Sequence, residues 1–292
     1  MQKRRFILAG VSLPVILTIG GLAMTPRATG QLPVEPAHNS GLGITGAFEG
    51  WFKNSDGTFS LLVGYFNRNA KEELDIPAGP NNRIEPGPPD QGQPTHFLPR
   101  RQWGVFRIIV PKDFGEKKLR WTIVANGKTN TIPLSLNPLW EISPFKEESM
   151  GNTPPTITFS QGKAVQGPLG TEPAELSATT DTPVELTVAV ADDAKVLAGG
   201  TPPKTPPLVV TWSLFRGPAP VTFSNAKPSL PEFESPEKNG VKATATTQAT
   251  FTEPGQYILL VVANDWSGEG GRGFQCCWTT GHVKVNVKAA GK

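Results

Sequence analysis

The only two cysteines of the chain, Cys276 and Cys277, are neighbours in the stretch GFQCCWTTGH, which also contains His282. Thiols and an imidazole can carry out redox chemistry or bind a soft metal ion, so this stretch is the first candidate site. Neighbouring residues of a regular strand point to opposite faces, which argues against a shared metal. The set also supplies three ligands where structural zinc takes four, so copper(I) is the metal that fits best.

Three states of the cysteine pair remain open: reduced thiols with at least one buried, a disulfide between the neighbours, or a bridge to another chain. Neighbouring Cα atoms lie about 3.8 Å apart across a trans peptide, whereas most disulfides need about 4.4–6.8 Å, so an internal disulfide predicts a strained ring. An oxidising compartment would favour either disulfide, and a strained, exposed one would suit a redox switch. A structural role and a thiol-redox or copper function are the two alternatives.

A second group of candidate residues lies at the ends of predicted strands. If VELTVAVA and LVVTWSLF are successive strands of a sandwich, their loop meets the loop that follows QYILLVVAND at one end. That end would gather Asp192, Asp193, Asn264, Asp265 and Trp266. Carboxylates with an amide suit a calcium ion, and the indole offers an apolar face to a glycan or peptide. The alternative is that Asp and Asn only end these strands by bonding nearby backbone amides.

Sequence patterns typical of catalysis are absent. The chain has no G-x-S-x-G, no H-E-x-x-H and no phosphate-binding glycine loop. His38, His96 and His282 are far apart in the sequence. We therefore predict a protein that is not an enzyme, with no catalytic residue and no cofactor beyond the calcium or copper considered above. An acid pair needs no motif, so a hydrolase or glycan-binding activity in the first half is a further alternative.

The N-terminal segment is typical of an export signal. A basic cluster, Lys3–Arg5, precedes the apolar run Phe6–Met24, and small residues at Ala28–Gly30 suit cleavage. Residues 1–30 are predicted to be a signal peptide or, if uncleaved, an anchor that is the only membrane attachment. The protein is therefore expected in the periplasm, on the cell surface or secreted. This segment holds four of the 28 basic residues, and the 25 acidic residues balance the rest, which leaves no electrostatic case for nucleic acid.

The remainder of the chain is predicted to be all-β, with two β-sandwich domains. Its 30 prolines and 31 glycines, with short runs of Val, Thr, Phe and Trp, are typical of strands joined by long turns. A flexible leader is expected over residues 31–45 and a first domain over 46–145. Asn54–Gly57 and Asn126–Gly127 mark two hairpins. Residues 78–100 form a loop too long for an ordinary connection, which predicts a binding element or a disordered insert. His96, Glu85 and Asp90 lie in it, but nothing in the sequence fixes them relative to one another.

A linker over residues 146–155 precedes the second domain, which is expected over 156–289. Residues Tyr257–Val262 are apolar at every position, whereas a sandwich strand with one wet face should alternate. Both faces of this strand therefore need cover. A further strand, a folded loop or the first domain would cover it within the chain, and a partner protein is the alternative. The runs expected to be strands are TITFS, VELTVAVA, LVVTWSLF, PVTFS, ATATTQATF, QYILLVVAND, FQCCW and HVKVNVK.

The stretches VTWSLFRGPAPVTFSN, ATFTEPGQYILLVVAND and HVKVNVK resemble the polycystic-kidney-disease (PKD) type of immunoglobulin-like sandwich. The likeness covers about residues 154–288 and is most specific at Glu253–Tyr257, where an acidic residue, Gly and Tyr match the turn into the penultimate strand of that family. It implies seven strands, Trp212 in the core and a tyrosine corner closed by Tyr257. The W-D-F-G-D-G stretch of many such domains is missing after Trp212. The resemblance implies adhesion or spacer roles, with a protein or glycan at the cell surface as partner.

Overall fold

The computed structural model describes residues 38–148, 151–160, 163–195, 208–230, 240–267 and 276–291. These residues belong to one compact unit. The predicted signal peptide lies outside them. Regular structure in the described residues is almost entirely β, as predicted, with a single turn of 3-10 helix, η1 (Pro138–Trp140). In this part of the chain no helix is long and apolar enough to cross a membrane.

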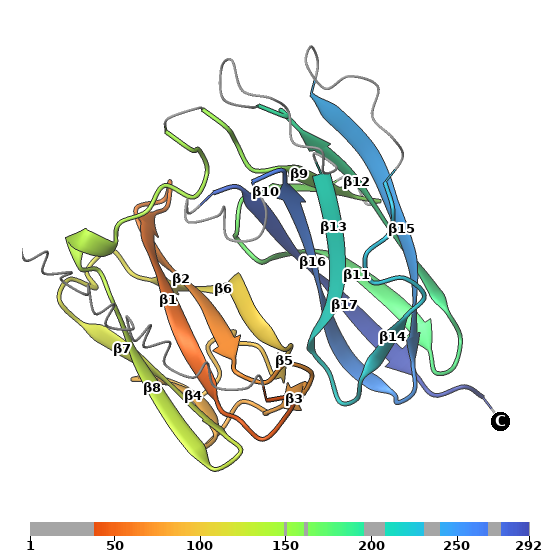
Figure 1. The fold of residues 1–292 in the computed structure, drawn as a ribbon, viewed down its shortest axis with the longest axis horizontal. Helices are drawn as coiled ribbons and strands as arrows, with labels where there is room; N and C mark the ends of the chain where they lie inside the picture. Colours follow the sequence, from red (N-terminus) through yellow and green to blue (C-terminus); the bar gives the residue numbers. More distant parts are fainter. Residues whose placement is uncertain are drawn as a thin grey trace, which may run out of the picture. The chain divides into compact units, whose positions relative to one another are not determined.

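The N-terminal region, which we define as residues 38–148, contains two three-stranded sheets and one two-stranded sheet (Figure 1). The sheet orders are β1-β2-β6 and β4-β7-β8, and β3 pairs with β5. Both predicted hairpins, β1 with β2 and β7 with β8, are confirmed. The strands are β1 (Ile44–Lys53), β2 (Phe59–Asn67), β3 (Leu74–Asp75), β4 (Asn82–Glu85), β5 (His96–Phe97), β6 (Arg100–Val110), β7 (Lys118–Ala125) and β8 (Lys128–Ser135).

The core of the N-terminal region is built around Trp121 of β7, which is 1% exposed. Its ring meets Phe106 edge-on at 5.2 Å and stacks on Phe97 at 6.4 Å. β1 approaches this ring closely because it carries Gly46, where a Cβ would lie 2.8 Å from the indole. Any larger residue at this position would therefore separate β1 from β7.

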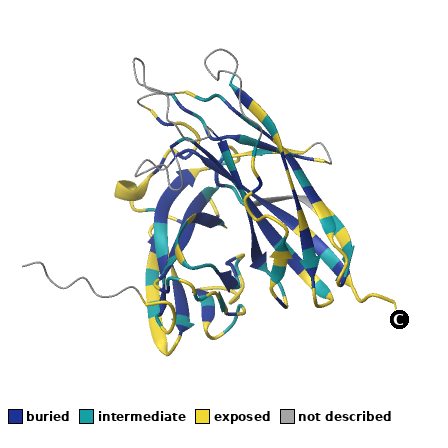
Figure 2. Cartoon of the chain, turned by 45° about the vertical axis from the view of Figure 1, so that its right-hand side comes forward, coloured by how far each residue is buried: buried dark blue, intermediate teal, exposed yellow. Residues whose placement is uncertain are grey.

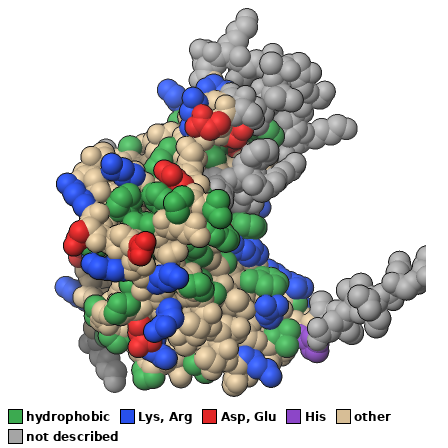
Figure 3. Space-filling view, turned by 90° about the vertical axis from the view of Figure 1, so that its left-hand side faces the viewer, with side chains coloured by type: hydrophobic (Ala, Val, Ile, Leu, Met, Phe, Trp, Pro, Cys, Tyr) green, Lys and Arg blue, Asp and Glu red, His purple; other side chains and the backbone are tan. Residues whose placement is uncertain are grey.

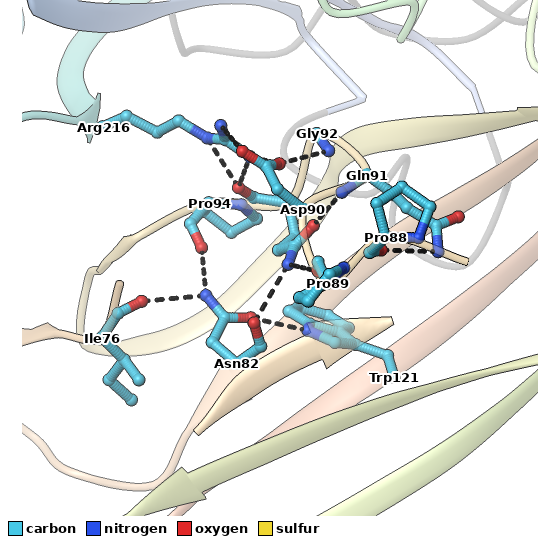
Figure 4. A network of polar contacts seen from close by, with 11 residues as sticks. Ile76, Asn82, Pro88, Pro89, Asp90, Gln91, Gly92, Pro94, Trp121 and Arg216 are labelled. Carbon is cyan, nitrogen blue, oxygen red and sulfur yellow. Dashed lines mark hydrogen bonds and ion pairs between the residues drawn. The ribbon is translucent and has the colours of Figure 1, made fainter. Parts of the chain in front are cut away.

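The long loop between β3 and β6 is ordered by a buried amide (Figure 4). Asn82 is fully buried, and its Nδ2 donates hydrogen bonds to the carbonyls of Ile76 at 2.9 Å and Pro94 at 2.8 Å. Its Oδ1 accepts one from Trp121 Nε1 at 2.9 Å. Gln93 then donates to the Asn82 carbonyl at 3.1 Å. Of the two alternatives for this loop, the disordered insert does not hold, because the segment contains β4 and β5, which pair with β7 and β3, and its buried polar side chains are hydrogen-bonded.

The C-terminal region, which we define as residues 151–291, contains a five-stranded sheet, β10-β9-β12-β15-β14, and a four-stranded sheet, β11-β17-β16-β13. The sequence predicted two strands at the C-terminal end, FQCCW and HVKVNVK, whereas the structure has one, β17. The two cysteines lie just before β17 begins. The prediction missed β10 and β11, and β11 runs parallel to β17. The strands are β9 (Thr156–Phe159), β10 (Ala164–Gln166), β11 (Thr171–Thr179), β12 (Val184–Asp192), β13 (Leu208–Arg216), β14 (Val221–Phe223), β15 (Val241–Phe251), β16 (Gly255–Asp265) and β17 (Trp278–Lys288).

Trp212 and Tyr257 lie in the core of the C-terminal region and are 2% and 1% exposed. The Tyr257 hydroxyl donates a hydrogen bond to the carbonyl of Glu253 at 2.9 Å, which is the geometry of a tyrosine corner. The ring meets Phe251 at 4.8 Å. A Cβ at Gly217 would lie 2.4 Å from the Tyr257 ring, so a glycine is needed there. The two sheets together exceed the seven strands that the PKD resemblance implied.

Strand β16 belongs to two cores. Leu259 and Val261 are fully buried in the core of the C-terminal region. Leu260, which is 7% exposed, points the other way and joins the core of the N-terminal region, together with Phe215 of β13. In Figure 2 the strands where the two regions meet are dark blue, the colour of buried residues. The prediction of cover within the chain is confirmed, and the N-terminal region supplies it.

The predicted leader and linker are both partly fixed. The backbone N–H of Leu42, inside the expected leader, donates a hydrogen bond to Asn69 Oδ1 at 2.7 Å. Asn152, inside the expected linker, is 1% exposed. Residues 38–45 are therefore not a free leader, and the described part of the linker is packed; residues 31–37 lie outside the described ranges.

Candidate functional site

Two predicted site residues form a polar cap at one end of the C-terminal sandwich. Asp192 ends β12 and Asp265 ends β16, and they are 8% and 2% exposed. Both face inward, because Val190 and Ala263, two residues earlier in each strand, are buried in the core. The strands therefore carry two carboxyl groups to the end of an apolar core.

The carboxyl group of Asp265 is held by neighbouring donors. Asn152 Nδ2 donates to Oδ2 at 2.5 Å, and the Ser267 N–H donates to Oδ1 at 2.8 Å. The Ser267 hydroxyl donates to the same Oδ1. Burial raises the pKa of Asp265, and these hydrogen bonds oppose the increase. The group is thus fixed in place as a link between the linker and β16.

Asp192 is less well satisfied. Its Oδ2 accepts a hydrogen bond from the Ala194 N–H at 2.7 Å, while its buried Oδ1 has no partner among the described residues. Burial raises the pKa of Asp192 to about 7, and the charges of Asp265 and Asp193 add to the increase. We therefore expect this carboxyl group to be partly protonated near neutral pH.

Asn264 does not join this cap, which corrects the prediction, whereas Trp266 meets the loop after β12 at the same end, as predicted. Asn264 precedes Asp265 on β16, and alternation turns it to the opposite face. There it lines a cavity of about 60 Å³ together with Trp278, and its Oδ1 has no hydrogen-bond partner in the described part of the chain. Trp266 is half-buried, and its Nε1 donates to the Lys195 carbonyl at 2.5 Å. The indole thus closes a loop instead of standing free for a ligand.

The cap does not fit a calcium ion. Asp193 accepts a hydrogen bond from the Thr153 hydroxyl at 2.9 Å and pairs with Lys195 Nζ at 3.5 Å, so its oxygens are directed away. Calcium takes about six to eight oxygens. In the described ranges no group of three or more His, Cys, Asp or Glu side chains could hold a metal ion.

Cys276 and Cys277 form a disulfide beneath the cap, joined by a cis peptide. They are 2% and 0% exposed, and their Sγ atoms lie 3.9 and 3.5 Å from the Asn152 carbonyl oxygen. His282 lies further along β17, about 16 Å away at about 3.3 Å per residue, and its ring stacks on Phe215 at 4.2 Å. Oxidised sulfurs and a distant imidazole do not make a copper site.

The candidate residues of the long loop each have a separate partner. His96 is buried, with Nδ1 2.8 Å from Asp75 Oδ1 and Nε2 3.2 Å from Glu73 Oε2. Glu85 pairs with Arg83 at 3.0 Å on the surface. These groups stabilise the fold of the loop and do not converge on a common point.

Two charge-assisted hydrogen bonds join the long loop to β13, and sequence reasoning missed them (Figure 4). Arg216 donates from two nitrogens to the carboxylate of Asp90 at 2.8 and 3.0 Å. Its Nε also donates to the Gln93 carbonyl at 2.8 Å. The backbone adds a hydrogen bond from Thr95 N–H to the Phe215 carbonyl at 3.1 Å. The loop is therefore part of the contact between the two regions.

The N-terminal region carries an open groove of about 750 Å³ that the sequence did not indicate. Trp51 and Phe59 form its apolar part, and their rings meet edge-on at 5.5 Å. Next to it, η1 exposes Leu139 (90%) and Trp140 (48%). Figure 3 shows this side of the molecule, with hydrophobic side chains gathered in its upper part among charged ones. The charged residues lining the groove are Lys112, Lys118, Glu116 and Glu141.

No protein-family model matches the chain, and no curated protein sequence matches it. Among solved structures, the N-terminal domain of PorA aligns with a TM-score of 0.24 and 12% identity, over 47% of this chain and 99% of that one. Domains 4 and 5 of the S-layer protein SbsC align with a TM-score of 0.23 and 13% identity, over 84% of this chain and 96% of that one. The sialic acid binding region of a Streptococcus sanguinis adhesin aligns with a TM-score of 0.22 and 10% identity, over 86% of this chain and 78% of that one. Similarities this low carry no inference about function.

Proposed function

We propose that the chain is an exported, non-enzymatic protein of the cell envelope or extracellular space that acts as a rigid spacer and presents a binding face. The observation that carries the proposal is strand β16, whose two faces lie in two cores. Domains within one chain usually meet through modest polar interfaces and move relative to each other. Here Leu260 and Phe215 extend one apolar core across the contact, and such a contact resists bending.

Unfolding experiments test the rigid-spacer proposal. We expect the native protein to unfold in one transition, because neither region can open without exposing the shared core. Leu260→Asp would place a charge in the core of the N-terminal region and should separate the transition into two. Leu139→Asp is the matched control, because Leu139 is 90% exposed on η1. Two transitions in the native protein, or an unchanged single one in Leu260→Asp, would contradict the proposal.

Export has its own test. The intact mass of the protein recovered outside the cytoplasm should lack the mass of residues 1–30. A full-length mass in the membrane fraction would indicate an anchor instead, and a full-length mass in the cytoplasm would refute export.

Glycan or peptide binding in the groove is a second candidate function. The groove combines aromatic walls with charged rims, and Trp140 offers half of its surface beside it. Trp140→Ala should abolish binding found by a glycan or peptide array. Trp103→Ala is the control, because Trp103 is comparably exposed at 38% but lies under the Arg101 guanidinium. Equal binding by native protein and Trp140→Ala would eliminate this candidate.

The two alternative functions fit less well. Thiol exchange requires a thiolate to reach a disulfide sulfur, and both sulfurs here are buried. A glycosidase acid needs a desolvated carboxyl group that keeps its proton, whereas Glu116 and Glu141 of the groove are both exposed. We therefore propose neither function.

A further inference from the structure

A second cavity, of about 230 Å³, lies between the two regions and is distinct from the groove. Its walls combine polar and apolar side chains and come mainly from β6, β13, β16 and β17. Two guanidinium groups and one imidazole line it, those of Arg107, Arg216 and His282. Cationic groups beside apolar side chains suit an organic anion. The apolar lining residues are Phe106, Ile109, Leu169, Phe215 and Ile258.

Arg107 supplies a positive charge that has no direct ion-pair partner among the described residues. It is half-buried on β6, and its NH1 donates to the Ser60 hydroxyl at 3.2 Å. Among the described residues it forms no ion pair. Burial lowers the pKa of Arg107, and the charge of Asp56 opposes this in part. A bound anion would offset that desolvation.

His282 supplies an unused polar atom. It is 5% exposed, and its buried Nε2 has no hydrogen-bond partner among the described residues. Its ring is fixed by stacking on Phe215. Gly170 approaches the other side: a Cβ there would lie 3.2 Å from the imidazole. Leaving such an atom unpaired is unfavourable, and a ligand that accepts a hydrogen bond would remove the deficit.

The charge balance of the cavity selects the type of anion. Arg216 is paired with Asp90, whereas Arg107 forms no ion pair among the described residues and has only the more distant Asp56 as a counter-charge. A single negative charge matches this balance, whereas a phosphate would bring close to two. Planar guanidinium groups bind carboxylates through paired hydrogen bonds. The apolar side chains of the lining suit an organic body attached to the charged group.

We propose that this cavity binds a small organic monocarboxylate. Arg107 anchors the carboxylate, His282 Nε2 donates a hydrogen bond to it, and Phe106 and Phe215 contact the apolar body. Arg216 positions the loop edge of the cavity through Gln93 and Asp90. The site is independent of the spacer function proposed above and would make the contact between the two regions responsive to a ligand.

Benzoate and benzamide form the test pair, because they share a ring and differ in charge. We expect benzoate, followed by NMR of the ring-labelled histidines, to shift the His282 resonances to saturation while benzamide does not. Arg107→Gln should weaken benzoate binding at least tenfold. Arg120→Gln, an exposed arginine on β7, should leave it unchanged. Equal shifts with both compounds, no shift with benzoate, or unchanged affinity in Arg107→Gln would overturn the proposal.

A second measurement uses the native protein alone and does not depend on a variant that folds. Burial, with a smaller contribution from Arg216, lowers the pKa of His282 to about 3. A carboxylate beside the ring favours its protonated form, so saturating benzoate should raise this pKa. The charged groups around the ring are Arg107, Arg216 and Asp90, with Lys284 and Glu175 further along the same sheet face. A His282 pKa that benzoate leaves unchanged would contradict direct contact.

Discussion

Arg216 and Asp90 are 126 residues apart in the sequence and are joined side chain to side chain by two hydrogen bonds, at 2.8 and 3.0 Å. The first residue ends a strand of the C-terminal region, and the second lies in the long loop of the N-terminal region. The guanidinium also donates to the Gln93 carbonyl, so it pairs with a backbone acceptor as well as with the carboxylate. The pair thus connects the order of the loop to the contact between the regions.

Removing either partner of this pair should have unequal effects. Asp90→Asn should reduce the free energy of unfolding by about 0.5–1 kcal/mol, because Asp90 is half-exposed. Arg216→Met should cost about 1–3 kcal/mol, because it also leaves the Gln93 carbonyl unpaired. Urea unfolding at pH 7 measures both, and Glu85→Gln, which breaks an exposed pair with Arg83, should change little. Equal losses in the two variants would show that the charge pair alone matters.

The same pair predicts a pH dependence. The hydrogen bond from Arg216 is the main cause that lowers the pKa of Asp90. A carboxyl group with a lowered folded pKa stabilises the protein above its unfolded pKa of about 3.9, and loses this effect as the pH falls through the folded value. The difference in the free energy of unfolding between the native protein and Asp90→Asn should therefore be largest at pH 7 and vanish in strong acid.

Asn82→Asp should be severely destabilising. The change removes two hydrogen bonds to carbonyls and places a buried charge against the carbonyl oxygens of Ile76 and Pro94. Isolating a buried charge costs about 3–5 kcal/mol. Thermal unfolding should show a large fall in Tm, while Asn81→Asp, at an exposed neighbouring position, should not. A small effect at Asn82 would mean that the loop is not organised by this amide.

Asp192→Asn should stabilise the protein at alkaline pH. Because the folded pKa of Asp192 is about 7, above its unfolded value, the folded state binds more protons in between and loses stability as the pH rises. Asp192→Asn removes this loss, so its free energy of unfolding should exceed that of the native protein by about 1–3 kcal/mol at pH 8 and by close to zero at pH 4. Denaturant unfolding across this range checks the prediction, with exposed Asp113→Asn as control. A gain that does not depend on pH would contradict it.

Alkylation should find no free thiol in the native protein. Both cysteines are buried, so a reductant should leave the disulfide intact until the sandwich end opens. Intact mass after reduction and alkylation should show no label in buffer and two labels in urea. If the native protein in the presence of reductant were alkylated as fast as the unfolded protein, the disulfide would be accessible.

The strands and their pairing could be largely predicted because they follow local patterns. Asn126 and Gly127 have φ of 48° and 70°, the positive values that a tight hairpin needs and that Asn-Gly supplies. The apolar positions on both faces of Tyr257–Val262 correctly required cover on both sides. These signals lie within a few residues of the structure they determine.

The order of the long loop and the make-up of the candidate site could not be predicted. Asn82, Gln93 and Arg216 look like ordinary surface residues in the sequence, and their roles depend on partners that only the tertiary fold brings near. Asn264 was wrongly grouped with Asp265, although strand alternation places neighbours on opposite faces. Strand alternation can be read from the sequence, and applying it to the end of this strand would have placed Asn264 and Asp265 on opposite faces.

Strand β16 also limits how this sequence can vary. An ordinary sandwich strand keeps every second residue free to drift among polar types, because that residue meets only water. From Tyr257 to Val262 no position has this freedom, since each side chain is committed to one interior or the other. A polar substitution at any of these positions therefore disturbs a core, so the stretch should change more slowly than a strand that has one face in water.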